Sequence, residues 1–213
     1  MTLATRLIAL VALSAPSMLA DMIFLVQVDT SSLGPTATGF LDLQFNPAGV
    51  PSPAGTANVT DFAGVSFTVD DGTASALGDI SGSLTPGPLV FGNGTVFNDY
   101  FVPFQITAAG SGFSFLVGIS GDILSPDPAN LNGTDFAVLL FGDDGFTPLL
   151  TADGQSARIA VSPAGDVDAQ GFGPTAVMEV PEPSMAIPLL AALAYTVRRI
   201  KANALKVRRA QRG

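Results

Sequence analysis

The sequence predicts an all-β protein, an antiparallel β-sandwich of the jelly-roll-like kind, with a targeting segment at each end. Three observations support this. Short runs rich in Val, Phe and Thr alternate with turn clusters of Gly, Pro, Asp and Asn at a spacing of roughly ten residues. In the clearest runs, apolar and polar residues alternate with a period of two. Before residue 185 no segment keeps the 3.6-residue period of a helix.

Residues 1–20 have the features of a secretory signal peptide. Arg6 is the only charge, residues 7–13 form a short apolar core, and small residues precede Asp21. Cleavage after Ala20 is expected, although Met18 is larger than the small residue usual three positions before the cut. The alternative is that this segment is simply the first core strand or helix.

The predicted body covers residues 21–178 and begins with two well-marked strands. Residues 22–29 form an apolar run that suits a buried first strand. Residues 39–45 place Leu41, Leu43 and Phe45 on one face and Asp42 and Gln44 on the other. This alternation predicts a strand with one face in the core.

The next runs are less regular. Residues 57–62 and 65–69 are separated by Ala63-Gly64, which indicates a hairpin or a bulge. Residues 77–84 alternate weakly. Residues 95–107 are interrupted by Pro103, so two strands or a broken edge strand are expected there. The best candidates for central strands are residues 112–119 and 135–141. The last strands are predicted at residues 157–161 and 175–180.

Charge is segregated along the chain. All 18 acidic residues lie between Asp21 and Glu182, and Arg158 is the only one of the nine basic residues in that stretch. The stretch from Asp21 to Glu182 therefore carries a net charge of −17, which is 18 negative charges against one positive. Such a body repels nucleic acid and attracts cations or basic partners, so nucleic-acid binding is excluded.

Three residue types are missing, and their absence excludes whole classes of chemistry. The chain has no Cys, no His and no Trp. Disulfides, thiol nucleophiles, thiolate or imidazole metal sites and a Ser-His-Asp triad are therefore impossible. We expect a protein that is not an enzyme and that has no obligatory cofactor.

The C-terminal end combines three features in order. Val180-Pro181-Glu182-Pro183-Ser184 comes first, as a linker motif over residues 179–184. An uncharged stretch of 13 residues, 185–197, follows and predicts a transmembrane helix over 185–200, short against the roughly 20 residues of a full span. A basic stop (Arg198, Arg199 and Lys201) and a basic cytoplasmic tail over 201–213 complete the pattern. The alternative is a plain tail anchor or an amphipathic helix.

This order of Pro-Glu-Pro, apolar segment and basic cluster resembles the PEP-CTERM sorting signal of exported bacterial proteins. The resemblance implies recognition by an exosortase, transient anchoring in the inner membrane through the C-terminal helix, and processing near Pro181, Glu182 and Pro183. The apolar stretch is shorter than usual and contains Pro188, and the basic tail is more spread out. The body is also similar to a PEP-CTERM group of unknown function, through segments such as residues 28–31, 39–47, 97–101 and 147–151.

Acidic pairs at turns are the candidate metal ligands. They are Asp70 with Asp71, Asp143 with Asp144, and Asp166 with Asp168, each within three residues. Calcium prefers oxygen ligands, so such loops could bind it weakly. None has the spacing of an EF-hand loop, and Asp followed by Gly also simply makes turns.

These features together predict a non-enzymatic exported protein of the bacterial cell surface or biofilm matrix. Its expected partners are an exosortase, the membrane and an exopolysaccharide. The rival hypothesis is a calcium-dependent carbohydrate- or ligand-binding module, and a third is a subunit that keeps its membrane anchor.

Overall fold

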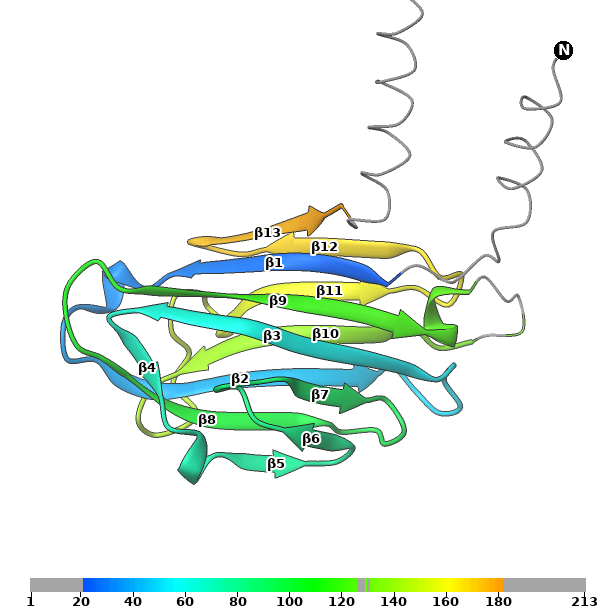
Figure 1. The fold of residues 1–213 in the computed structure, drawn as a ribbon, viewed down its shortest axis with the longest axis horizontal. Coiled ribbons are helices and arrows are strands. Elements are labelled where there is room, and N and C mark those ends of the chain that lie inside the picture. Colours follow the sequence, from blue (N-terminus) through cyan, green and yellow to red (C-terminus); the bar gives the residue numbers. More distant parts are fainter. Residues whose placement is uncertain (1–20, 126–128, 130, 182–213) are drawn as a thin grey trace, which may run out of the picture. The chain divides into compact units, whose positions relative to one another are not determined.

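The computed structural model describes residues 21–125, 129 and 131–181 of the chain (Figure 1). The predicted signal peptide and most of the predicted C-terminal segment lie outside the described residues. In the described part, strands dominate and helices are limited to short 3-10 turns. The elements are β1 (Met22–Asp29), η1 (Ser31–Leu33), β2 (Thr38–Pro47), β3 (Gly55–Val65), β4 (Phe67–Val69), η2 (Asp71–Thr73), β5 (Ser75–Leu77), β6 (Ile80–Gly82), β7 (Leu89–Gly92), β8 (Asp99–Ile106), β9 (Gly112–Gly121), η3 (Asp122–Leu124), β10 (Thr134–Phe141), β11 (Gln155–Val161), β12 (Val167–Gly171) and β13 (Thr175–Val180).

The strands form two antiparallel sheets, which confirms the predicted all-β class and its β-sandwich architecture. Sheet A has the order β13-β1-β9-β3-β7-β6. Sheet B has the order β12-β11-β10-β2-β8-β4, and β5 also pairs with β8. Successive strands repeatedly change sheet, so most pairings join segments that are far apart in the sequence, as Figure 1 shows for β1 beside β9.

The core lies between the sheets and follows from the period-two alternation. β9 buries Phe113, Phe115, Val117 and Ile119 from sheet A, each at most 4% exposed. β2, a central strand of sheet B, buries Leu41, Leu43 and Phe45, each at 0% exposure. The predicted inward face of residues 39–45 is therefore confirmed.

Aromatic rings join the two layers. Phe67 of sheet B lies with its ring centroid 4.5 Å from that of Phe113 of sheet A. Phe136 of β10 meets Phe91 and Phe115 edge to face, at 6.0 and 6.5 Å. Such pairs contribute roughly 0.5–1.5 kcal/mol each beyond the area that they bury.

The region predicted as a hairpin or bulge is one long strand with a bulge. β3 runs from Gly55 to Val65, and its register with β9 shifts between Thr60 and Ala63. Asp61 and Phe62 lie opposite the single residue Phe115, so β3 has one extra residue at this bulge, which precedes Ala63-Gly64. After Ser66, which has a positive φ of 52°, the chain enters β4 of the other sheet.

β8 is continuous, so the predicted break at Pro103 is wrong. β8 pairs with β2 on one side, and on its other side with β5 over Asp99–Phe101 and with β4 over Phe104–Ile106. The Pro103 carbonyl accepts a hydrogen bond from the Asp70 N–H at 3.0 Å, just past β4. In an antiparallel strand the N–H and C=O of one residue point to the same side. The missing N–H of Pro103 therefore faces the gap between β4 and β5, where no ladder bond is lost.

Two strands lack a clear signal in the sequence. β7 follows a Pro-rich turn, and β12 covers five residues in a region that reads as turns. Asp166-Val167-Asp168 was predicted at a turn, but Val167 and Asp168 belong to β12. The pairing of β12 with β11 explains this, since its register runs from Val161 opposite Val167 to Ala157 opposite Gly171.

Replacing Phe115 with alanine should lower the free energy of unfolding by about 3–5 kcal/mol, because the cavity would lie between the sheets. Phe146 is 84% exposed, so Phe146→Ala is a matched control with an expected change within about 0.5 kcal/mol. Urea unfolding measures both. Equal losses would contradict the placement of Phe115 in the core.

Candidate functional site

Asp70 and Asp71, the first predicted metal-ligand pair, mainly organise the chain around η2. The Asp70 carboxylate accepts hydrogen bonds from the Gly72 N–H at 3.1 Å and the Thr73 hydroxyl at 3.0 Å. This is an Asx-type turn cap. Asp70 therefore has a local structural role in the described fold.

Asp71 has a longer reach, because its carboxylate ties η2 to two other segments. It accepts bonds from the Tyr100 hydroxyl at 2.5 Å, the Leu84 N–H at 3.1 Å and the Thr85 N–H at 2.8 Å, as well as from the Thr85 hydroxyl. Burial acts to raise the pKa of Asp71, but the bonds from Thr85, Tyr100 and Leu84 outweigh it and hold the pKa below its ordinary value. Burial and the Asp71 carboxylate together raise the pKa of Tyr100.

The second pair lies in the turn after β10. Asp144 accepts hydrogen bonds from the N–H groups of Phe146 and Thr147 at 2.9 and 2.8 Å and from the Thr147 hydroxyl at 2.6 Å. The Thr147 side chain contributes most, followed by the two N–H groups, and they lower the pKa of Asp144 to about 2. Asp144 is thus an ionised carboxylate that holds this turn together.

The structure brings Asp70 and Asp143 together, although they are far apart in the sequence. Both line a shallow hollow of about 340 Å³ at the ends of β2, β4 and β8. Phe40, Pro103 and Gln105 line it as well. The hollow therefore combines an apolar floor with two carboxylates and an amide.

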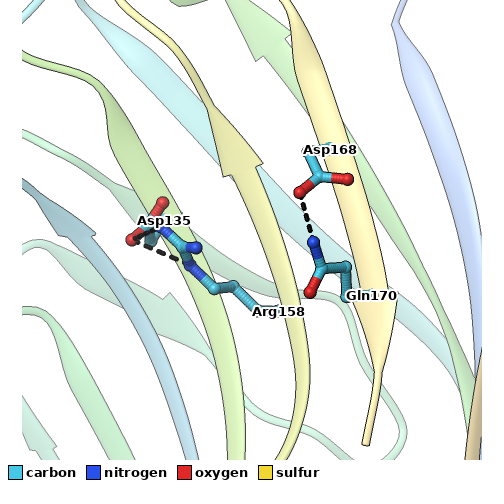
Figure 2. A network of polar contacts seen from close by, with 4 residues as sticks. All are labelled: Asp135, Arg158, Asp168 and Gln170. Atoms are coloured by element: carbon cyan, nitrogen blue, oxygen red, sulfur yellow. Dashed lines mark hydrogen bonds and ion pairs between the residues drawn. The ribbon is translucent and has the colours of Figure 1, made fainter.

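Asp168, which belongs to the third predicted pair, lies on the strand next to the only ion pair of the described residues (Figure 2). The Nη2 and Nε atoms of Arg158 on β11 donate to Asp135 Oδ2 on β10 at 2.8 and 3.2 Å. On β12, Gln170 Nε2 donates to Asp168 Oδ2 at 2.5 Å. Asp166 and Asp168 share a hollow with Asp135 and Arg158. The Arg158 and Asp135 side chains are 41% and 40% exposed, so this pair contributes little to stability.

A cluster that the sequence did not single out lies on the outward face of sheet B. We call Asp42, Gln44, Asn46 and Asp99 the polar ladder. Gln44 Nε2 donates to Asp42 Oδ2 at 2.6 Å, and Asn46 Nδ2 donates to Gln44 Oε1 at 3.3 Å and to Asp99 Oδ1 at 3.2 Å. The ladder joins two carboxylates on neighbouring strands through two amides.

Asp42 is the exceptional member of the polar ladder, since it is only 6% exposed although it lies on the outward face. Its neighbours across the strands are Phe101 of β8 and Leu139 of β10. Asp42 Oδ1 is buried and has no hydrogen-bond partner among the described residues. Burial raises the pKa of Asp42 to about 7, the Gln44 hydrogen bond opposes this, and the charge of Asp99 adds to it.

Three phenylalanine rings lie next to the polar ladder on the outward face of sheet B. Phe40 and Phe101 stack with centroids 4.5 Å apart, and Phe141 lies 6.4 Å from Phe101. Most phenylalanines were predicted to lie in the core, and these three are outward exceptions. They cover the Asp42 end of the polar ladder with apolar surface.

The predicted sorting motif begins where the described fold ends. Val180 is the last residue of β13, and Pro181 follows it. Glu182, Pro183, Ser184, Arg198, Arg199 and Lys201 lie outside the described residues. Within the described part, no helix is long and apolar enough to span a bilayer. Nor do three or more acidic side chains gather there into a group that could hold a metal ion.

Comparison of the chain with protein-family models, curated proteins and solved structures finds no match. The resemblance to PEP-CTERM proteins therefore stays a prediction.

Replacing Asp71 with alanine should lower the free energy of unfolding by about 1–3 kcal/mol, because the Tyr100 hydroxyl and the Leu84 and Thr85 N–H groups lose their acceptor. Asp143→Ala is the control, since the Asp143 side chain has no hydrogen-bond partner among the described residues. Urea unfolding compares the two. No difference between the variants would contradict the anchoring role of Asp71.

Asp42 should make stability fall with rising pH. Its pKa of about 7 in the fold exceeds the ordinary value of 3.8, so the folded chain binds this proton more tightly than the unfolded chain. The contribution is fully favourable below about pH 4, is lost as the pH rises toward about 7, and amounts to roughly 4 kcal/mol.

Urea unfolding with a chelator present, from about pH 4 to about pH 8, measures this decline. Asp42→Asn should flatten it, whereas Asp168→Asn, on an exposed side chain of the same sheet, should leave it unchanged. A decline that persists undiminished in Asp42→Asn would rule out Asp42 as its source.

Proposed function

We propose that this chain is an exported bacterial protein of the cell surface or extracellular matrix, sorted through its C-terminal Pro-Glu-Pro segment, and that its body is not an enzyme. The observation that carries the proposal is the position of the motif. The last strand, β13, ends at Val180, directly before Pro181. A cut in residues 181–184 would leave every strand of both sheets intact.

The charge distribution supports an orientation in which the C-terminal tail stays in the cytoplasm and the body is outside. The basic residues Arg198, Arg199 and Lys201 follow the apolar stretch 185–197, and basic residues beside a span stay in the cytoplasm. The acidic body would then lie outside. An exosortase is the proposed processing partner, and the membrane anchor is transient.

The body is the part that remains after sorting, and we propose that its sandwich is of the jelly-roll-like kind. The chain crosses between the sheets from β1 to β2, from β2 to β3 and again from β8 to β9 and β10. Each sheet therefore contains strands from both ends of the body. Such a fold suits a protein that must survive outside the cell without disulfides.

A second candidate function is carbohydrate or ligand binding, with calcium and an exopolysaccharide as the proposed ligands. The hollow beside Phe40 favours it, because Asp70, Asp143 and Gln105 line it together with an apolar floor. Sugar sites combine an apolar surface with a few polar groups in this way. We rank it second because the Asp70 carboxylate is already used within its turn.

Replacing Pro181 and Glu182 with alanine should block processing in a host that has an exosortase, and the protein should then keep its tail and stay with the membrane fraction. Deleting residues 181–213 should release the body from the membrane route altogether. Pro163→Ala, in a turn outside the motif, is the control. Unchanged location and mass for the double variant, together with an unchanged location for the deletion, would reject this route.

A further inference from the structure

The first and last strands of the body leave it at the same end of the sandwich. β1 begins at Met22, and β13 ends at Val180. At the far end of β1, the Asp29 N–H donates to the Pro174 carbonyl, just before β13, at 3.1 Å. The two neighbouring strands therefore run in opposite directions, and the start of β1 lies beside the end of β13 (Figure 1). We call this end of the sandwich, from which the chain continues in both directions, the exit end.

Three connecting segments also lie at the exit end. β1 begins opposite Ile119, close to the end of β9. Gly121, the last residue of β9, lies opposite Gly55, the first residue of β3. Pro47, the last residue of β2, lies opposite Thr134, the first residue of β10. The β2–β3 loop and the segment before β10 are therefore at this end, and so is the β7–β8 loop, since β8 runs antiparallel to β2.

Exposed apolar side chains gather on these segments. Of the eight large apolar side chains that are strongly exposed in the described part of the chain, five lie at the exit end: Val50, Leu77, Val96, Phe97 and Leu131. Leu77 belongs to this group because it ends β5 opposite Asp99, the first residue of β8. Single exposed apolar residues are normal, but several gathered at one end indicate an interaction surface. We call these five side chains the apolar tips.

Two asparagine side chains fix the segments that carry the apolar tips. Asn132 Nδ2 donates to the Pro51 carbonyl at 2.9 Å and ties the segment before β10 to the β2–β3 loop. Asn93 Nδ2 donates to the Pro53 carbonyl at 2.7 Å and ties the β7–β8 loop to the same loop. The surface is thus formed in advance, so little conformational entropy is lost when it binds.

We propose that the exit end docks on the membrane surface, with the apolar tips in the interfacial region of the bilayer. The inference rests on the proposed function, in which the segment after Pro181 anchors the chain in the membrane. An anchored chain would hold the exit end, and not the opposite end, at the bilayer. Anchoring also raises the effective concentration of lipid at the tips, so a weak apolar contact is enough.

Charge opposes this contact, so burial of the apolar tips must drive it. Asp79 and Asp122 line a hollow at the exit end, beside Val50. Arg158 is the only Lys or Arg in the described part of the chain, so the body offers no basic patch to anionic headgroups. The contact should therefore be strongest on zwitterionic lipid and weaken when anionic lipid is added.

Fluorophores on single cysteines test the docking, because the natural chain has no Cys. Phe97→Cys and Leu131→Cys carry the label at the exit end, where the natural side chains are 64% and 82% exposed. Val65→Cys and Phe146→Cys are the matched controls at the opposite end, where the natural side chains are 68% and 84% exposed. Each full-length variant is reconstituted into phosphatidylcholine vesicles.

A nitroxide on the lipid chains just below the headgroups should quench the labels at 97 and 131 and leave the two control labels bright. Iodide in the water should quench the labels at 97 and 131 about twofold less than the controls, because the interfacial region shields them. Added phosphatidylglycerol should weaken the lipid quenching. All four substitutions are at exposed positions, so each variant should unfold as cooperatively as wild type.

The proposal is overturned if iodide quenches all four labels alike, if the lipid nitroxide quenches the controls equally, or if phosphatidylglycerol strengthens the lipid contact. A chain that does not float with the vesicles would reject both the docking and the anchor. Lipid quenching at 97 and 131, combined with an unprocessed mass in the host, would uphold the docking and reject the sorting.

Discussion

The structure depends on the mutual burial of one face of each sheet. β2 and β9 hold central positions in their sheets and each presents an uninterrupted row of apolar side chains to the other layer. Because strand neighbours such as β1 and β9 are distant in the sequence, neither sheet can be completed without chain from the other end of the body. Inter-sheet packing and strand pairing therefore depend on each other, and this core positions the loops and the outward faces.

Charge is the second constraint, and it determines how the polar groups are used. With Arg158 as the only cation of the body, its carboxylates cannot be balanced by ion pairs. Asp71 and Asp144 instead accept several N–H and O–H groups each. Such bonds favour the charged form and also organise turns without requiring a basic residue. Asp42 departs from this solution, since one of its oxygens has no donor within the described fold.

Local pattern was enough to predict the fold class and much of the core. The alternation of Leu41, Leu43 and Phe45 predicted β2 and its buried face, which the structure confirms. It could not predict that Asp42, on the opposite face, is buried too, because Phe101 and Leu139 come from strands that pair with β2 only in the folded chain. The break predicted at Pro103 is wrong for the same reason. Pro103 is tolerated within β8 because it lies opposite the gap between β4 and β5, and these strands pair with β8 only in the folded chain. The sequence predicts that Asp166 and Asp168 lie together at a turn. Asp168 is instead part of β12, a strand whose formation depends on pairing with β11.

The proposed sorting would separate the acidic body from two targeting segments, and the intact mass of the protein recovered from its host tests this most directly. We predict a mass that lacks residues 1–20 and everything after a cut within residues 181–184, so that both complete sheets remain. A mass that retains the basic tail, with Arg198 to Arg212, would contradict it. The protein would then be a permanently anchored membrane protein.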